Sequence, residues 1–177
     1  LLTKEWIINA IKMFEQNDCI AAISGNAIPY IPGRKNDKNG KTCFLIREFY
    51  WLVGCTYFDD NDAQSGSHAT LIGSNMIFRE PVLDAIGGFN EKLGFISRGK
   101  KKIYIGGEDT EAAYRILLTR IGKIAYNRNM IAYHIIFPEK LRIFSMLKRA
   151  FWQPLSLKLI YTELAQSNLK LENMPYS

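Results

Sequence analysis

The chain has 177 residues, of which 47% are hydrophobic and 23% are charged, and its formal net charge is +6. These proportions are typical of one globular domain and exclude a disordered tail, a collagen-like fibre and a low-complexity array. Three widely spaced cysteines exclude a disulfide framework or a zinc ribbon, and they fit a reducing, cytoplasmic compartment. No apolar run approaches the ~20 residues that span a bilayer, while the basic excess permits an anionic membrane surface as a partner.

The first third of the chain predicts a helix, a buried strand and a long loop. Apolar residues recur at helical spacing over residues 6–14, and Thr3 stands where a helix N-cap is expected. Residues 19–24 form a short apolar run that stops at Gly25, which is typical of a strand buried on both faces. Residues 26–42 show no periodicity and predict a loop.

The middle of the chain alternates between helical, polar and strand-like patterns. Residues 43–53 have helical spacing, and residues 54–67 form a polar and acidic loop. Residues 69–78 predict a strand. A short helix then begins at Pro81 and ends at Gly87-Gly88.

The last part of the chain contains the most regular predicted helix, which begins at Glu108-Asp109 and has Gly122 as its C′ residue. Strands are predicted at residues 124–126 and 130–136, with an Asn-Arg-Asn turn between them. An amphipathic helical region, interrupted at Pro154, closes the chain. Because strands alternate with helices, the sequence predicts an α/β fold with a mixed sheet flanked by helices and a helical C-terminal region.

The sharpest motif is Gly106-Gly107-Glu108-Asp109. Two glycines permit close backbone approach to a ligand, and the carboxylates stand at a predicted helix N-terminus, where free N–H groups favour a negative charge. Such a carboxylate can accept a proton from a hydroxyl nucleophile. Asp109 can also simply cap its helix, and on this motif alone capping is the more common role of Asp.

Three other positions have both a structural and a functional interpretation. Gly73-Ser74-Asn75 indicates either a strand bulge or a ligand that lies against the backbone. His134, in an apolar strand, fits a hydrogen-bonded core residue better than a metal ligand. Asp60 and Asp62 have the D-x-D spacing of Mg²⁺ or Mn²⁺ ligands, but they lie inside a polar loop rather than at a strand end.

Basic residues gather in two regions, residues 98–102 and the C-terminal region from Lys140 to Lys158. Each region could neutralise phosphate groups or form solvated surface. In the C-terminal region the basic residues alternate with aromatic ones such as Phe144 and Phe151. This amphipathic pattern suits an interfacial membrane helix, and it suits docking in a groove of a partner protein equally well.

Taken in order, four blocks resemble the C-terminal half of a family 2 glycosyltransferase with the GT-A fold. The blocks are Gly73-Ser74-Asn75-Met76-Ile77-Phe78-Arg79, Ile86-Gly87-Gly88-Phe89-Asn90-Glu91, Gly107-Glu108-Asp109-Thr110-Glu111 with Arg115, and Gly122-Lys123-Ile124-Ala125-Tyr126 with Tyr133-His134. Their order and spacing are more specific than any one block. The resemblance implies that residues 1–138 are the C-terminal part of a GT-A domain and that residues 139–177 are an amphipathic helical extension.

The resemblance also implies roles for individual residues. Asp109 corresponds to the catalytic base of the family, and Glu108 is its neighbour in the catalytic pair. His134 corresponds to a metal ligand. The positions that correspond to residues around the substrates are Gly73, Ser74, Asn75, Gly107, Arg149 and Trp152.

In the family the metal-binding D-x-D segment precedes a region like residues 3–7, so we expect this chain to be part of a longer protein. The resemblance then implies an inverting transferase that uses Mg²⁺ or Mn²⁺, a nucleotide-sugar donor and a saccharide or lipid-linked acceptor. We expect no nucleic-acid partner, a cytoplasmic or peripheral membrane location, and no turnover by the chain alone. The alternative is a non-catalytic basic binding or partner-docking module that retains a partial GT-A scaffold.

Overall fold

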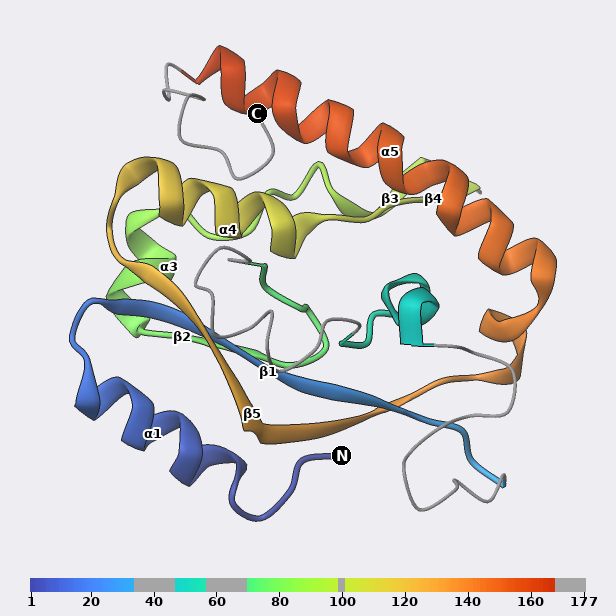
Figure 1. The fold of residues 1–177 in the computed structure, drawn as a ribbon. Coiled ribbons are helices and arrows are strands. Elements are labelled where there is room, and N and C mark those ends of the chain that lie inside the picture. Colours follow the sequence, from blue (N-terminus) through green and yellow to red (C-terminus); the bar gives the residue numbers. More distant parts are fainter. Residues whose placement is uncertain (34–46, 57–69, 99–100, 168–177) are drawn as a thin grey trace.

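A computed structural model describes residues 1–33, 47–56, 70–98 and 101–167 (Figure 1). The strands are β1 (Ile20–Tyr30), β2 (Met76–Phe78), β3 (Gly94–Arg98), β4 (Lys101–Ile105) and β5 (Lys123–Ile135). The α-helices are α1 (Trp6–Gln16), α3 (Glu80–Ala85), α4 (Glu108–Thr119) and α5 (Ile143–Gln166). Two 3₁₀ helices, η1 (Arg47–Val53) and η2 (Pro138–Leu141), complete the described elements.

The main sheet has three strands in the order β2–β1–β5. The central strand β1 runs parallel to β5 and antiparallel to β2, so the sheet is mixed. A separate antiparallel hairpin joins β3 to β4, with Gly94 opposite Ile105. The predicted α/β class, a mixed sheet flanked by helices with a helical C-terminal region, is confirmed, and it is consistent with a partial GT-A-like fold.

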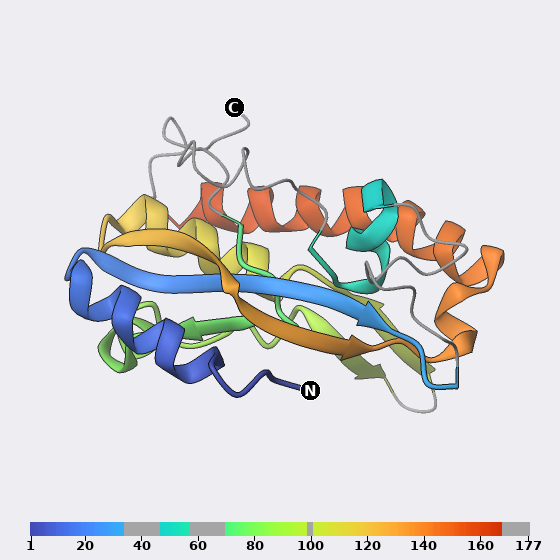
Figure 2. The same cartoon turned by 60° about the horizontal axis from the view of Figure 1, so that its bottom comes forward.

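Helices cover both faces of the main sheet (Figures 1 and 2). Successive residues of a strand point to opposite faces, so Ile23 packs with Ala10 of α1 while its neighbour Ala22 packs against α3 and α4. The core between the sheet and α3 and α4 consists of Ala21, Ala22, Leu71, Val82, Ile86, Ala112, Ala113 and Ile116. Burial of these side chains fixes the position of α4, whose N-terminus carries the Glu108-Asp109 pair.

β5 is one continuous strand rather than the two that the sequence predicts. Its register with β1 shifts in the middle, because Gly25 lies opposite Asn127 whereas Asn26 lies opposite Ile131. The expected Asn-Arg-Asn turn is therefore an irregularity within one strand. A Cβ atom at Gly25 would lie 2.4 Å from the carbonyl oxygen of Met130. Glycine thus permits the close approach of the two strands here, and β1 continues past it.

Two predicted helix ends are also wrong. Glu5, not Thr3, stands at the N-cap of α1, and no side chain caps that helix. α4 ends at Arg120, which adopts a left-handed conformation with a φ of 54°, rather than at Gly122. Gly122 is required for packing instead, because a Cβ atom there would lie 2.7 Å from the Cys19 carbonyl oxygen of the neighbouring segment.

Several other segments differ in regularity from the predictions. Only β2 is a strand within the described part of residues 69–78, and the described part of residues 43–53 is the 3₁₀ helix η1. α5 runs without interruption through Pro154, since burial of Ser156, Ile160 and Leu164 holds the helix beyond it. None of the described helices is both long enough and apolar enough to cross a membrane. The predicted domain boundary after residue 138 stays a prediction.

Candidate active site at the N-terminus of α4

The carboxylate of Asp109 lies against the backbone of Gly73, 36 residues earlier in the chain. The Gly73 N–H donates a hydrogen bond to Asp109 Oδ2 at 2.8 Å. A Cβ atom at position 73 would lie only 3.1 Å from that same oxygen, so glycine leaves room for the carboxylate. Gly73 is exposed and Asp109 is half-buried. The structure thereby brings together two of the predicted site residues at an accessible surface.

The capping interpretation of Asp109 is correct only in part. The N-cap position of α4 belongs to Gly107, whose φ of 104° is left-handed, and Asp109 lies inside the first turn. Asp109 Oδ1 does accept a hydrogen bond from the Thr110 N–H at 2.7 Å. One oxygen therefore satisfies a free N–H of the helix terminus, while the other faces Gly73 in a different segment.

Ser74 continues this surface toward His134. Its hydroxyl donates a hydrogen bond of 2.5 Å to the carbonyl oxygen of Gly54, just after η1. A Cβ atom at Gly54 would lie 3.9 Å from His134 Nε2. A continuous series of neighbours thus leads from Asp109 to His134, through residues 73–74 and Gly54. Nothing in the sequence indicated that Gly54 would join these segments.

Asn75 joins the segment that carries Gly73 and Ser74 to Trp6 and to β5. The residue is 3% exposed, and its side chain donates to the Met130 carbonyl oxygen at 2.7 Å and accepts a 2.7 Å hydrogen bond from Trp6 Nε1. Its backbone carbonyl also accepts the Gly25 N–H. Both side-chain polar atoms have protein partners, so the geometry favours a supporting position for Asn75 over direct contact with a substrate.

Glu108 and Gly107 make contacts with other segments of the chain. Glu108 Oε2 is buried, has no hydrogen-bond partner among the described residues and lies near Gly94 at the start of β3. A Cβ atom at Gly107 would lie 2.9 Å from the Ile160 side chain of α5. Glycine at position 107 therefore permits both the left-handed N-cap conformation and the close approach of α5. The two carboxylates of the pair thus meet different segments, Asp109 at Gly73 and Glu108 near Gly94.

The other end of the site is electrically positive. Burial lowers the pKa of His134, and the charges of Lys140 and Arg149 lower it further. Burial and the charge of Arg149 also lower the pKa of Lys140. His134 is therefore a neutral imidazole beside several cations at neutral pH. Lys140 is a member of this positive region that the sequence reasoning did not single out for the site.

This region does not by itself fit a divalent metal ion. The described residues contain no group of three or more His, Cys, Asp or Glu side chains that could hold one. The cationic neighbours of His134 oppose a second positive charge unless carboxylates are added from elsewhere. The expected Mg²⁺ or Mn²⁺ stays a prediction for the complete enzyme, and Asp60 and Asp62 lie outside the described residues.

Arg149 and Trp152 both belong to α5, and Arg149 contacts the segment that leads into the site. Its guanidinium Nη1 donates to the Leu52 carbonyl oxygen in η1 at 2.5 Å. Trp152 is half-buried and packs edge-to-face with Phe151, at 5.8 Å between the ring centroids. Arg149 thus joins α5 to the segment that carries Gly54, and the covering role of Trp152 stays a prediction.

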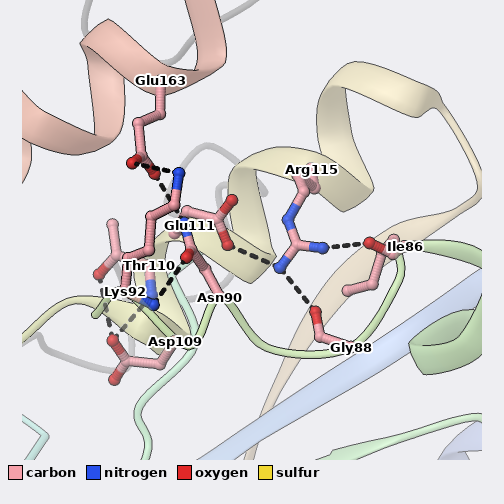
Figure 3. Close-up of polar contacts among 9 residues, drawn as sticks. All are labelled: Ile86, Gly88, Asn90, Lys92, Asp109, Thr110, Glu111, Arg115 and Glu163. Atoms are coloured by element: carbon pink, nitrogen blue, oxygen red, sulfur yellow. Dashed lines mark hydrogen bonds and ion pairs between the residues drawn. The ribbon is translucent and has the colours of Figure 1, made fainter. Parts of the chain in front are cut away.

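A network of polar side chains holds the outer side of α4 (Figure 3). Glu111 and Arg115 form a largely buried ion pair of 2.6 Å, and Arg115 also donates to the carbonyl oxygens of Ile86 and Gly88. The helical i, i+4 spacing of the pair could have predicted this contact. Next to it lies an open recess of about 380 Å³, where Asn90 and Lys92 contact Glu163 of α5.

Two further groups of residues from the sequence analysis cannot be placed. Asp60 and Asp62 lie outside the described residues, as do the side chains of the basic run at residues 98–102.

The comparisons with known proteins point to one enzyme class. The chain is 26% identical over 160 residues to a glucosyl-dolichyl phosphate glucuronosyltransferase of Haloferax volcanii. The alignment covers 88% of this chain and 46% of the relative, so the chain spans about half the length of that enzyme. No family model matches the chain, and no solved structure matches it. Similarity to this enzyme supports a glycosyltransferase role in general.

Proposed function

We propose that the chain is the acceptor-binding half of an inverting family 2 glycosyltransferase, with Asp109 as its general base. The observation that carries the proposal is the hydrogen bond between Asp109 Oδ2 and the exposed Gly73 backbone. A carboxylate placed only to cap α4 would not need a glycine in another segment to make room for it. Asp109 is instead held at a surface that an acceptor can reach.

In the proposed reaction an acceptor hydroxyl donates a hydrogen bond to the Asp109 carboxylate, which takes its proton. The freed oxygen forms a bond to the anomeric carbon of a nucleotide sugar as the bond to the diphosphate breaks. The leaving diphosphate carries away the electron pair, and a single displacement inverts the anomeric configuration. The Gly73 and Thr110 N–H groups orient the carboxylate through the 2.8 Å and 2.7 Å hydrogen bonds.

The positive region around His134 would lie toward the departing negative charge. Lys140 and Arg149 raise the local potential, as their effect on the pKa of His134 indicates. Such preorganised positive charge stabilises a developing anion most strongly where water is partly excluded. Ser74 and Gly54, which a hydrogen bond joins to each other, would then form the floor between the base and this region.

The acceptor that we propose is a lipid-linked saccharide. The name of the Haloferax relative describes a glucuronosyltransferase that acts on glucosyl-dolichyl phosphate. The nucleotide-sugar donor would be bound mainly outside this chain, since the chain aligns with less than half of that enzyme. We also propose a divalent cation in the complete enzyme, with further ligands from outside the described residues.

A transfer assay on the full-length protein tests the proposal. The protein is incubated with labelled nucleotide sugars and with a glycosylated polyprenyl phosphate, and the product is analysed for its anomeric configuration by NMR. We expect acceptor-dependent transfer with inversion, and much less transfer to the free saccharide. A product that retains the donor configuration would contradict the single displacement. Absence of transfer with every donor, together with tight binding of the acceptor, would favour the alternative of a non-catalytic binding module.

A further inference from the structure

The first half of α5 carries a row of large apolar side chains that face outward. We name this row the α5 ridge; it consists of Ile143, Phe144, Leu147, Phe151 and Leu155. Ile143 and Phe144 are 76% and 79% exposed. Phe137, just before η2, adds another exposed aromatic ring close by in the sequence. So many large exposed apolar residues on one helix are unusual for a surface that faces water alone.

The α5 ridge lies opposite the side by which α5 is attached. At about 100° per residue the ridge occupies an arc of about 120°. The buried residues Ser156, Ile160 and Leu164 project from the other side of the helix, toward α4 and Leu93. Figures 1 and 2 show α5 along the outside of the fold, with its first half extending beyond the N-terminal end of α4. The ridge is therefore unused by the described fold.

Charge distinguishes the possible partners of this surface. Between Lys140 and Thr162 the sequence has no Asp or Glu, and its basic residues are Lys140, Arg142, Lys148, Arg149 and Lys158. Arg142, Lys148 and Lys158 are exposed. A helix with an apolar stripe flanked by cations is the form that lies in a membrane interface and attracts anionic lipid headgroups. A protein partner would need an acidic groove to match the same cations, whereas an anionic bilayer matches them without a shaped site.

We propose that the α5 ridge inserts into the surface of an anionic lipid bilayer, with the cations of α5 at the level of the headgroups. This proposal does not depend on the transferase reaction, because it rests only on the exposure and charge of α5. It would nevertheless keep the protein at the surface where a lipid-linked substrate resides. Attachment by one helix face would be reversible and sensitive to salt.

Vesicle flotation of the 177-residue chain tests the proposal. Vesicles of phosphatidylglycerol mixed with phosphatidylcholine are compared with vesicles of phosphatidylcholine alone. We expect binding to the anionic vesicles, weaker binding to the neutral ones and release as salt is raised. The double variant Phe144→Ser/Phe151→Ser should lower the affinity for anionic vesicles by about tenfold or more. Lys148→Glu should lower the affinity for anionic vesicles only. Circular dichroism spectra establish that the variants remain folded.

A matched control comes from α1, where Ile8 and Ile11 are 50% and 48% exposed. The double variant Ile8→Ser/Ile11→Ser changes the same kind of residue on another face, so it should bind vesicles like the wild type. Equal binding by the Phe144→Ser/Phe151→Ser variant would overturn the proposal. So would a wild-type chain that ignores vesicles and forms dimers that this variant abolishes, because the ridge would then be a protein interface.

Discussion

Asp109 connects the helix terminus to the candidate site through separate oxygens. Oδ1 accepts the Thr110 N–H within α4, and Oδ2 accepts the Gly73 N–H from a distant segment. Replacement by Asn keeps one acceptor oxygen for these donors and removes the charge. Because Gly73 is exposed, water can satisfy a donor that loses its partner, so the cost in stability should stay small. Catalysis and capping are therefore separable at this residue.

His134 makes stability depend on pH in a defined direction. Its pKa in the folded chain lies below the ordinary value of 6.5, first because of burial and then because of nearby cations. The unfolded chain consequently binds more protons at this residue in the range below pH 6.5. The folded state keeps its full stability above that pH and loses stability as the pH falls toward the lower pKa of the folded state.

We therefore expect the free energy of unfolding to fall between about pH 7 and about pH 5, and to fall less in a His134→Gln variant. Denaturant titrations of both proteins across this range measure the difference. Identical pH dependence in the wild type and in His134→Gln would show that the imidazole is not perturbed as the structure indicates.

At the scale of elements, the position of α4 depends on an ion pair that is nearly inaccessible to water. The side chains of Glu111 and Arg115 are 5% and 16% exposed, and Arg115 also ties α4 to the turn after α3. Removing one partner of a buried pair leaves an uncompensated charge, whereas removing both can be nearly neutral. The pair holds the helix that presents Asp109, although neither side chain faces Gly73.

We expect Arg115→Met to destabilise the chain by about 3–5 kcal/mol, and the double variant Glu111→Gln/Arg115→Met to recover part of that loss. Lys92→Met is the matched control, because the Lys92–Glu163 pair is 3.5 Å long and its lysine is exposed; its loss should cost about 0–1 kcal/mol. Thermal or denaturant unfolding measures all three. An effect of Arg115→Met no larger than that of Lys92→Met would contradict this account of α4.

The sequence was sufficient to predict most helices and strands, but not the contacts between them. Apolar residues at helical spacing, preceded by Gly106-Gly107, were sufficient to predict α4. The alternation of strands and helices was sufficient to predict the α/β class. The Asn-Arg-Asn segment was misread as a turn, because its irregularity depends on the pairing of Gly25 with β5. Gly122 was read as a helix cap, although its requirement comes from a contact with the segment before β1.

In the candidate site, too, the sequence predicts the residues of one segment but not the contacts between segments. The Glu108-Asp109 pair is visible in the sequence because both carboxylates stand at a predicted helix N-terminus. That Asp109 faces Gly73 while Glu108 lies near Gly94 depends on the packing of α4, which one sequence does not specify. The cationic surroundings of His134 likewise arise from η2 and α5, which follow it in the chain.

At the scale of the whole molecule, the described fold provides the proposed base and a positive region but no group of metal ligands. The chain aligns with 46% of the Haloferax enzyme, and a full donor site needs residues that we place outside this chain. We expect the purified 177-residue chain to show no transfer from any nucleotide sugar, and only weak binding of Mn²⁺ by calorimetry. Metal-dependent transfer by the chain alone would refute this division of labour and would direct attention to Asp60 and Asp62.

The most direct test of the central claim is the turnover of Asp109→Asn in the full-length protein. Loss of the proton acceptor should lower kcat by about 10²–10⁴-fold, while donor binding and Tm stay close to those of the wild type. Glu108→Gln, the matched control at the neighbouring carboxylate, should lower kcat less, because the Glu108 carboxylate lies near Gly94 whereas that of Asp109 is hydrogen-bonded to Gly73. An Asp109→Asn enzyme that is folded and turns over at the wild-type rate would contradict the assignment of Asp109 as the catalytic base.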